Sequence, residues 1–589
     1  MGGLIAAITG PPQTPIKGFL DRIKNILKYN SRGIIGVVVA AAVFLFLFDP
    51  HDKAQTVGGI WFAMFWFLLL QPIAIQPVGL IPLFAFPMFG ILSSADTCAV
   101  FFNENVILMF VGGWLHLVLN NCGMDKRLVS YFLCAGGDKA YSAKKILLKS
   151  MIASFFVSAI SNRLMVTSIV LENILPPISM LTGYAKNEVD YAEFKIILCN
   201  AVAVSSTLGS MCIVHASLIT LQLKIMFCEI GATELEYPDL FNYLQYSAYA
   251  VPTAIIMLIV NFIYHVLILK FVVEKKPMSN YSMGAVKTAL AKSRSSLGKM
   301  SSHEKVSTLI LIVSLACFFT RWSKWLGMGW ATFRKELVSS EEVPAIRDAT
   351  TAAIFVMALH FIPKSLNFLK IMSAKTKNDL PPAKMESGIL FWKYIDKNTD
   401  YSYFLLMGGS VALYMASVQT ALGLKIASNI GDSITGMGWD VGILIVILGA
   451  AFLGTIMSGT GAQAVYMPLI INMGLKGQGK WPLRTYLAVL GAGLGTGLGF
   501  SIPFLHTTCY YSKTLGKVTS KKQIKYGVPS TIICAVVLWV TLCFYAPILW
   551  DPDDYGIIAV VSPNAKVAVE GGGAAETTTA AAPAPPPEE

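Results

Sequence analysis

Two short polar motifs interrupt apolar stretches of the chain, and their residue types suit the binding of an anion. The first is Ser161-Asn162-Arg163 and the second is Ser458-Gly459-Thr460. Each stands between apolar pieces too short to cross a bilayer alone, as in a re-entrant hairpin buried in protein or facing a water-filled cavity. A half-helix that begins at such a break offers free N–H groups and the positive end of its dipole to an anion. We therefore expect an anion site at the two breaks; ordinary helix pairs with Ser and Thr contacts are the alternative.

Arg163 carries the strongest chemical signal of the two motifs. An arginine at membrane depth is costly and by default marks a site or a pathway. Its guanidinium keeps its proton and matches the geometry of a carboxylate with two parallel hydrogen bonds. Our hypothesis is that Arg163 binds a carboxylate of the substrate directly or locks the site. The alternative is that it pairs with an acid such as Glu172 or points into a cytosolic vestibule.

His215 and His506 follow the two motifs at comparable places, in otherwise apolar surroundings. Histidine changes its charge near neutral pH, so such a pair is a candidate for proton coupling. The alternative is that each imidazole is a buried side chain whose hydrogen bonds are satisfied. His116, Asn120 and Asn121 suit helix-end caps as well as a site, and we assign them no role.

The elements that must hold these residues are membrane helices. Of the 589 residues, 55% are hydrophobic and 14% are charged, and the mean hydropathy is +0.61, whereas soluble domains carry about 25% charged residues. A net charge of +12 combined with this hydropathy excludes a nucleic-acid binder. We predict an all-α polytopic protein in a lipid bilayer, with roughly a dozen spanning segments of about 20 residues. They lie near 33–48, 57–75, 105–119, 146–160, 194–208, 248–273, 305–320, 349–363, 403–419, 441–457, 486–504 and 528–549.

Other chemistry is not indicated by the residues. The ten cysteines form no CxxC pair, which argues against a zinc site or a disulfide framework. The sequence shows no nucleotide loop, catalytic triad or metal constellation. We expect no enzymatic activity, no cofactor and no metal site.

Charge patterning divides the chain and orients it. Cations precede the first span, and the positive-inside bias then places the N-terminus in the cytosol. The acidic, low-complexity tail follows the last span and is expected to be disordered and extracellular. We expect an integral protein of the plasma membrane. The predicted parts are a cytosolic segment 1–32, a first membrane half 33–273 with a hairpin near 159–178, a basic cytosolic linker 274–305, a second half 306–549 with a hairpin near 456–472, and the tail 550–589.

The two halves repeat one another. LMFVGG (108–113), AISNRL (159–164) and SSTLGS (205–210) are followed in the same order by LLMGGS (405–410), IMSGTGAQA (456–464) and GAGLGTGLG (491–499). Gly113 lies 48 residues before Ser161, and Gly409 lies 49 residues before Ser458. Two related halves around one midplane site are typical of secondary transporters. A channel more often shows pore rings or a filter loop, which are not visible here.

Several long segments carry a family resemblance. They include PVGLIPLFAFPMFGILSSADTCAVFF (77–102), MFVGGWLHLVLNNCGMDKRL (109–128), SAISN (158–162), ILFWKYI (389–395) and LLMGGSVAL (405–413). From about residue 58 to 549 the chain resembles the divalent anion:sodium symporter family, solute carrier family 13, and within it the animal Indy-like branch of citrate and dicarboxylate transporters. The resemblance implies two inverted repeats with re-entrant hairpins and a homodimer. Each protomer would have a scaffold and a transport domain that moves as an elevator.

The resemblance also implies a substrate site. Family members hold substrate carboxylates with a Ser-Asn-Thr motif at each hairpin tip, place sodium beside it, and follow each motif with a Thr- or Asn-containing loop. Carried over to this chain, the expected binding residues are Ser161, Asn162, Arg163, Ser458, Gly459, Thr460, Thr220 and Thr507.

This sequence departs from the family pattern at those positions. Arg163 replaces the first Thr, and Gly459 replaces the second Asn. The loop expected to read Thr-x-Asn is Leu218-Ile219-Thr220, and the loop expected to read Thr-Pro-Pro-Asn is His506-Thr507-Thr508-Cys509. Sodium, as a hard cation, requires several oxygen ligands, and these changes remove at least three of them. The residues therefore argue against family-type sodium coupling, and the Arg163 charge is a candidate replacement for a sodium ion.

Three interpretations remain open from the sequence. The first is a transporter of a small organic anion, citrate or a dicarboxylate, working by symport or exchange without family-type sodium coupling. The second is a transport-incompetent relative retained as a membrane binding, receptor or structural protein. The third is a transporter of a less charged substrate, since Gly459 and Ile219 make the site less polar.

Overall fold

The computed structural model confirms an all-α polytopic protein. In the described part of the chain, β-structure is limited to the isolated bridges Ser323–Met328 and Pro363–Gly388. The basic linker and the N-terminal segment are described only in part, and the tail lies outside the described residues apart from Trp550. The structure describes residues 18–136, 142–184, 188–229, 241–273, 280–323, 325–333, 346–365, 367–376, 380–381, 386–423, 425–426, 438–476 and 485–550.

Fewer helices reach spanning length than the windows of apolar sequence suggested. Among the described residues, eight helical segments are long and apolar enough to cross a membrane, or nine if the bent pair α17 (Trp392–Asn398) and α18 (Tyr403–Gln419) is one span. Other apolar stretches form shorter helices, such as Leu218–Phe227 and Tyr486–Leu498. The difference arises because a window of apolar sequence does not distinguish a full span from half-length helices that meet inside the protein.

The two halves contain the same succession of elements. In each, two helices separated by a two-residue break are followed by a third helix, a 3-10 turn, a short helix and a long helix. The first set is α8 (Ala143–Ile160), α9 (Arg163–Tyr184), α10 (Glu188–Ser210), η3 (Val214–Ala216), α11 (Leu218–Lys224) and α12 (Tyr243–Ile268). The second is α20 (Trp439–Ile456), α21 (Gly459–Lys476), α22 (Thr485–Gly495), η10 (Thr496–Leu498), α23 (Thr507–Thr514) and α24 (Ser520–Phe544).

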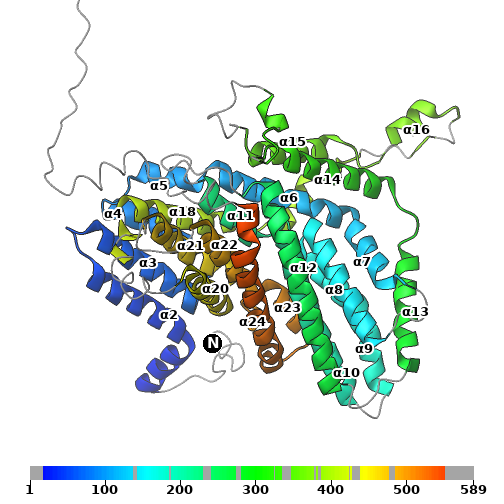
Figure 1. Ribbon diagram of the computed structural model, residues 1–589, viewed down its shortest axis with the longest axis horizontal. Helices are drawn as coiled ribbons and strands as arrows, with labels where there is room; N and C mark the ends of the chain where they lie inside the picture. Colours follow the sequence, from blue (N-terminus) through cyan, green and yellow to red (C-terminus); the bar gives the residue numbers. More distant parts are fainter. Residues whose placement is uncertain are drawn as a thin grey trace, which may run out of the picture.

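The remaining helices surround these two sets. Figure 1 shows α8, α9, α10 and α12 side by side, with α14 and α15 across one end and α13 at the edge beside α7. The surrounding elements are α2 (Phe19–Leu47), α3 (Lys53–Leu70), η1 (Gln76–Gly79), α4 (Leu80–Met88), α5 (Ser94–Phe101), α6 (Glu104–Cys122), α7 (Met124–Cys134), α13 (Asn280–Ser296), α14 (Ser302–Thr320), η7 (Trp330–Thr332), α15 (Asp348–Phe361), α16 (Asn367–Ser373), α17, α18 and α25 (Ala546–Leu549).

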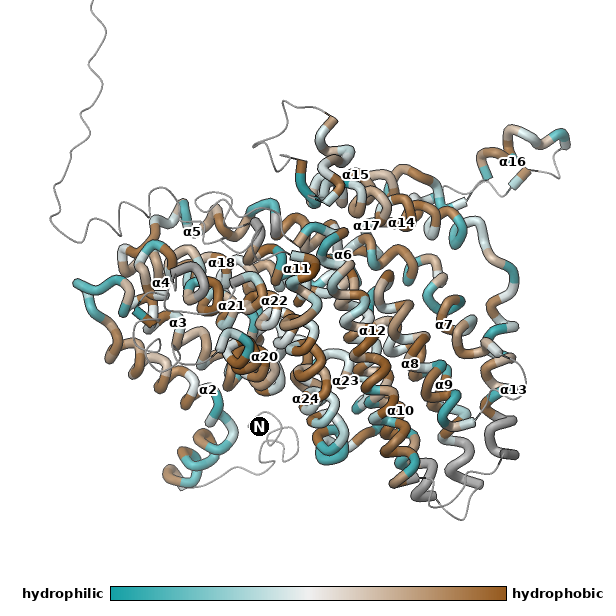
Figure 2. The backbone as a smooth tube through the Cα atoms, in the orientation of Figure 1, coloured by the Kyte–Doolittle hydropathy of each residue, from teal (hydrophilic) through white to brown (hydrophobic). Residues whose placement is uncertain are grey.

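Local chemistry sets several helix starts. Asp52 caps α3 by accepting from the Gln55 N–H at 3.1 Å, and Ser301 with Glu304 forms a capping box at α14. Figure 2 shows hydrophobic colour along most of α12 and α24. The side chains of Ile256, Ile259 and Ile263 are exposed on α12 at a spacing of three to four residues. Such an apolar outer face is what a helix presents to lipid.

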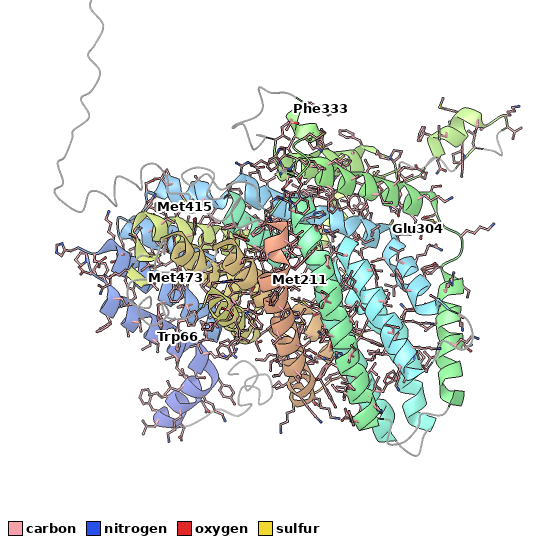
Figure 3. The ribbon with its side chains drawn as sticks, in the orientation of Figure 1. Trp66, Met211, Glu304, Phe333, Met415 and Met473 are labelled. Atoms are coloured by element: carbon pink, nitrogen blue, oxygen red, sulfur yellow. The ribbon has the colours of Figure 1, made fainter. Side chains whose placement is uncertain are left out.

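The first hairpin packs closely because α10 carries a small residue at the contact. Gly209 of α10 faces Phe155 of α8, and a Cβ at this position would overlap the Phe155 carbonyl. The chain then leaves α10 at Met211, which Figure 3 places in the middle of the molecule. The Tyr246 hydroxyl donates to the Met211 carbonyl at 2.8 Å. The irregular backbone after α10 is thus held by α12 and not by solvent.

Candidate anion-binding site

One cavity of about 470 Å³ brings the two polar motifs together. The motif residues Asn162, Arg163, Ser458, Gly459 and Thr460 all line it. The loops after the hairpins contribute as well, so the wall contains parts of both halves. The loop and histidine positions predicted from sequence that also line it are His215, His506 and Thr507.

The backbone of the first break orients Arg163 into this cavity. Helix α8 ends at Ile160, and Ser161 takes an extended conformation while its N–H still donates to the Val157 carbonyl. The side-chain carbonyl of Asn162 accepts from the Leu164 N–H at 2.9 Å, as an N-cap does. Helix α9 consequently begins at Arg163, whose carbonyl accepts from Ser206 at 3.1 Å.

The second break has a strained tip. Ser458 has a φ of 121°, a region that side-chain-bearing residues rarely adopt. Such a residue costs on the order of 1–3 kcal/mol and persists where surrounding structure imposes it, often at functional sites. The Ser458 hydroxyl accepts from the Gly461 N–H at 3.2 Å and so caps α21, which begins at Gly459.

The guanidinium of Arg163 has few partners in the described structure. Its Nη2 donates to Thr507 Oγ1 at 3.4 Å, and its buried Nη1 has no hydrogen-bond partner. Glu172, the acid considered as a partner, accepts from Ser168 at 2.6 Å, and no described ion pair involves Arg163. A buried N–H group left without a hydrogen-bond partner costs about 1–3 kcal/mol. The arrangement favours an anion in the cavity.

Gly459 has a packing reason for lacking a side chain. An added Cβ would lie 2.8 Å from Ile219 Cδ1 and 2.9 Å from the Thr496 carbonyl oxygen. Ile219, which the sequence placed in a loop, lies in the short helix α11, so the tip of the second hairpin touches the first half of the chain here. Gln463 strengthens this contact by donating to the Ile219 carbonyl at 3.0 Å.

Ser161 and Thr220 are not among the residues that line the cavity. Thr220 is buried, and its hydroxyl lies 2.6 Å from the Val214 carbonyl and 2.9 Å from the Ser217 carbonyl. It therefore holds the turn before α11. Ser161 is fully buried, and its hydroxyl has no hydrogen-bond partner.

The structure does not pair His215 with His506. His506 Nε2 lies 3.2 Å from the Gly497 carbonyl, and since a carbonyl only accepts, this nitrogen carries the proton. Its Nδ1 lies 2.9 Å from Thr508 Oγ1, and Thr508 contacts Thr207 of α10 at 3.0 Å. His506 is therefore engaged in a network that joins the two halves.

His215 contacts His116 instead, which the sequence left without a role. The two ring centroids are 4.5 Å apart, and both residues line the cavity. Gly112 makes this possible, because its Cα faces the His215 side chain and a Cβ would already lie 3.3 Å from His215 Cβ. The only signal in the sequence was a histidine in an apolar run, which does not identify a partner.

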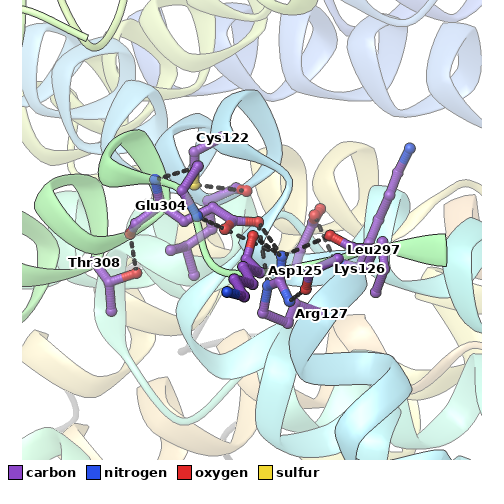
Figure 4. Close-up of polar contacts among 11 residues, drawn as sticks. Cys122, Asp125, Lys126, Arg127, Leu297, Glu304 and Thr308 are labelled. Carbon is purple, nitrogen blue, oxygen red and sulfur yellow. Dashed lines mark hydrogen bonds and ion pairs between the residues drawn. The ribbon is translucent and has the colours of Figure 1, made fainter. Parts of the chain in front are cut away.

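Several described ion pairs lie outside the cavity, and two of the groups they form are buried or partly buried. Asp348 pairs with both Lys224 and Arg321, with 2.6 Å to Arg321 Nε, and all three side chains are at most 2% exposed. Arg127 binds Glu304 at 3.1 Å and the carbonyls of Leu297 and Gly298. Figure 4 shows Arg127 in close-up with Glu304 and Leu297. The described residues contain no group of three or more His, Cys, Asp or Glu arranged to hold a metal ion.

Comparison with known proteins identifies the family. The family model for the sodium:sulfate symporter transmembrane region matches residues 30–550. The chain belongs to this family. It is therefore an integral membrane protein of a transporter family and not an enzyme, and the resemblance found in the sequence is confirmed.

The relatives share a low sequence identity with this chain, and two of the matches cover more than three quarters of it. "Protein I'm not dead yet" of Drosophila melanogaster is 24% identical over 482 residues, covering 77% of this chain and 78% of that protein. The sodium-dependent dicarboxylate transporter SdcS of Staphylococcus saprophyticus is 22% identical over 547 residues, covering 90% and 94%. Human solute carrier family 13 member 2 is 22% identical over 209 residues, covering 35% of this chain and 33% of that protein.

Proposed function

We propose that this protein is a secondary active transporter that carries a dicarboxylate or citrate across the plasma membrane, by symport or exchange. The proposal depends on the guanidinium of Arg163 at a hairpin tip, which lines a cavity built from both halves, takes part in no described ion pair and has a buried Nη1 without a hydrogen-bond partner. A carboxylate fits such a group because the planar guanidinium can offer it two parallel hydrogen bonds. The relative named as a dicarboxylate transporter supports this substrate class.

The proposal includes loss of the family's sodium coupling. The positive charge of Arg163 repels a cation from the first tip, and Gly459 offers no side-chain oxygen at the second. A sodium ion needs several oxygen ligands. The Arg163 charge would instead perform the neutralising role at the site.

Transport requires the site to face each side in turn. The matched order of elements in the two halves supports a repeat-based mechanism in which both hairpins move together with the substrate as an elevator. We further propose a homodimer, with the N-terminus in the cytosol and the C-terminus outside. These parts of the proposal derive from the family resemblance and the charge pattern.

The decisive test is uptake of labelled succinate and citrate by proteoliposomes, with and without sodium and at pH 5.5 and 8. We expect saturable uptake that does not require sodium. Arg163→Thr should abolish most of it, Arg163→Lys should retain a part because the charge remains, and the exposed-site control Arg294→Thr should leave it unchanged. Unchanged uptake in Arg163→Thr would remove Arg163 from the site.

Absence of uptake by correctly folded protein under every condition would overturn the transport proposal. It would instead favour a membrane binding, receptor or structural protein. Uptake of a neutral analogue in preference to succinate would favour the third interpretation, a less charged substrate.

A further inference from the structure

His116 of α6 and His215 of η3 form a pair on the cavity wall. Their ring centroids are 4.5 Å apart at an interplanar angle of 50°, and each residue is 4% exposed. His215 Nδ1 lies 3.0 Å from the Tyr243 hydroxyl. His215 Nε2 has no hydrogen-bond partner, and the described partner of the His116 ring is the backbone of Ile160, which leaves one His116 ring nitrogen open.

The ring nitrogens of His116 and His215 that lack a partner can still form hydrogen bonds with a bound molecule. A buried donor or acceptor left without a partner costs about 1–3 kcal/mol. The cavity has a volume of about 470 Å³, whereas a water molecule takes about 30 Å³ in the liquid. There is thus room at the pair for the end of a small organic molecule as well as for water.

The charges around the cavity indicate which chemical group of a bound molecule would lie at the histidine pair. Arg163 brings one positive charge to the cavity, so it neutralises one carboxylate of a bound dicarboxylate. The second carboxylate would be left buried without a counter-charge, which is strongly unfavourable. An imidazole that takes up a proton when the carboxylate binds supplies that counter-charge, because a carboxylate in direct contact favours the charged form of the ring.

The surroundings of the pair contain charges that are already engaged. Lys224 Nζ lies 5.2 Å from the centroid of the Tyr243 ring and is paired with Asp348, which also holds Arg321. Asp400 lies at an exposed part of the cavity and accepts from Gln76 at 3.2 Å. Phe318 of α14 covers His215 with an apolar ring at 5.0 Å. The titratable and charged groups on the cavity wall and on the elements packed around the pair include Tyr243, Lys224, Arg321, Asp348, Glu104, Arg347, Arg163, Asp400, Tyr403 and His506. Those elements also carry Asp125 on α7, His303, Glu304 and Lys305 on α14, His360 on α15, and Lys393, Tyr394, Asp396 and Lys397 on α17.

We infer that His116 and His215 bind the second acidic group of the substrate together with one proton. The proton comes from bulk water and is shared between an imidazole nitrogen and the carboxylate, and no covalent bond of the substrate changes. The inference rests on the proposed function, and it extends that function by naming how the far end of the dianion is recognised. Binding and release of the anion then carry a proton with it.

The test is calorimetric titration of the purified full-length protein with succinate in HEPES and in Tris, whose ionisation enthalpies differ. The buffer dependence of the observed heat gives the number of protons taken up. We expect wild-type protein at pH 7.5 to take up about one proton per succinate, and the Kd to rise up to about tenfold per pH unit above that.

Two variants and a matched control assign the proton. His116→Gln and His215→Gln keep an amide of similar size but do not titrate, so each should lose the proton uptake while Arg163 preserves measurable binding. His360→Gln is the control, because this histidine lies on α15 outside the cavity wall and bonds to the Val356 carbonyl at 2.8 Å. It should bind succinate with the wild-type proton uptake.

The outcomes are separable. Succinate binding without proton uptake in the wild type, or uptake retained in both glutamine variants, overturns the inference and leaves the proposed function standing. Absence of binding by any di- or tricarboxylate overturns the proposed function and the inference with it. Thermal unfolding of each variant establishes folding, and the amide of His116→Gln retains a donor for the Ile160 backbone, which keeps one variant informative.

Discussion

Arg163 at the start of α9 donates a hydrogen bond across the cavity to Thr507 at the start of α23, with 3.4 Å between Nη2 and Oγ1. The first residue belongs to the tip of the first hairpin, and the second begins the short helix that follows the second hairpin. An anion bound to this guanidinium is therefore held by both halves of the chain at once. The contact also fixes the plane of the guanidinium, which decides how its remaining donors are aimed.

Removal of this contact should weaken anion binding. In Thr507→Val the guanidinium of Arg163 loses its hydroxyl partner, and one hydrogen bond contributes about 1 kcal/mol. We expect the Kd for succinate to rise by up to about tenfold, the equivalent of 1.4 kcal/mol, as measured by calorimetry. Thr514→Val on the exposed face of the same helix is the control and should bind as wild type does. Equal affinity of the Thr507 and Thr514 variants would show that the contact does not orient Arg163.

Gly459→Ala should disturb the tip of the second hairpin. The added methyl group would press on Ile219 and on the Thr496 carbonyl, and overpacking of this kind typically costs about 1–3 kcal/mol. We expect a lower thermal unfolding midpoint in detergent and weaker succinate binding. Combination with Ile219→Ala should recover part of the loss. Gly33→Ala on α2, where an added Cβ meets nothing within 4 Å, should leave both quantities unchanged.

The buried Asp348 should be essential for stability. Asp348→Asn removes the carboxylate that Lys224 and Arg321 share, and breaking a buried pair costs about 3–5 kcal/mol. We expect a large fall in the unfolding midpoint, and Lys224→Met added to the same chain should restore part of it by removing one excess charge. Glu193→Gln breaks the more exposed pair with Lys522 and should cost at most about 1 kcal/mol. A mild effect of Asp348→Asn would mean that water reaches the cluster.

Arg127 should hold the chain before α14 in place. Figure 4 shows its guanidinium between Glu304 and the Leu297 segment, and it donates to the Gly298 carbonyl at 2.9 Å and the Leu297 carbonyl at 3.0 Å. Arg127→Lys keeps the charge for Glu304 but loses the fork that reaches the carbonyls. We expect trypsin to cleave after Lys299 about fivefold faster, since one hydrogen bond is about 1 kcal/mol. The neighbouring control Lys126→Gln should be cleaved at the wild-type rate, and a matching rate in Arg127→Lys would contradict this role.

The sequence predicted best those features that depend on a few consecutive residues. Polar residues between apolar half-segments marked the positions at which α8 and α20 end, because an interruption of this kind is visible in a few consecutive residues. The membrane class and the family were likewise legible from composition and motifs. The number of full spans was not, because short helices such as α11 and α22 have the same apolar composition as longer ones.

Contacts between distant residues could not be read from the chain. His116 and His215 are 99 positions apart, and their contact depends on Gly112 letting η3 approach α6. The environment of Arg163 was equally hidden, since Glu172 lies within three turns of it yet bonds to Ser168. Both the His116–His215 contact and the environment of Arg163 depend on helix lengths and side-chain directions in the tertiary structure, which the sequence does not reveal.

The contact between Gly459 and Ile219 constrains how this protein could evolve. Ile219 occupies the space that any side chain at position 459 would need. A single substitution of Gly459 by a residue with a polar side chain is therefore expected to lower the stability of the protein. Position 219 would have to become smaller and the backbone at Thr496 would have to shift, so a change at 459 is expected to be accompanied by changes at both places.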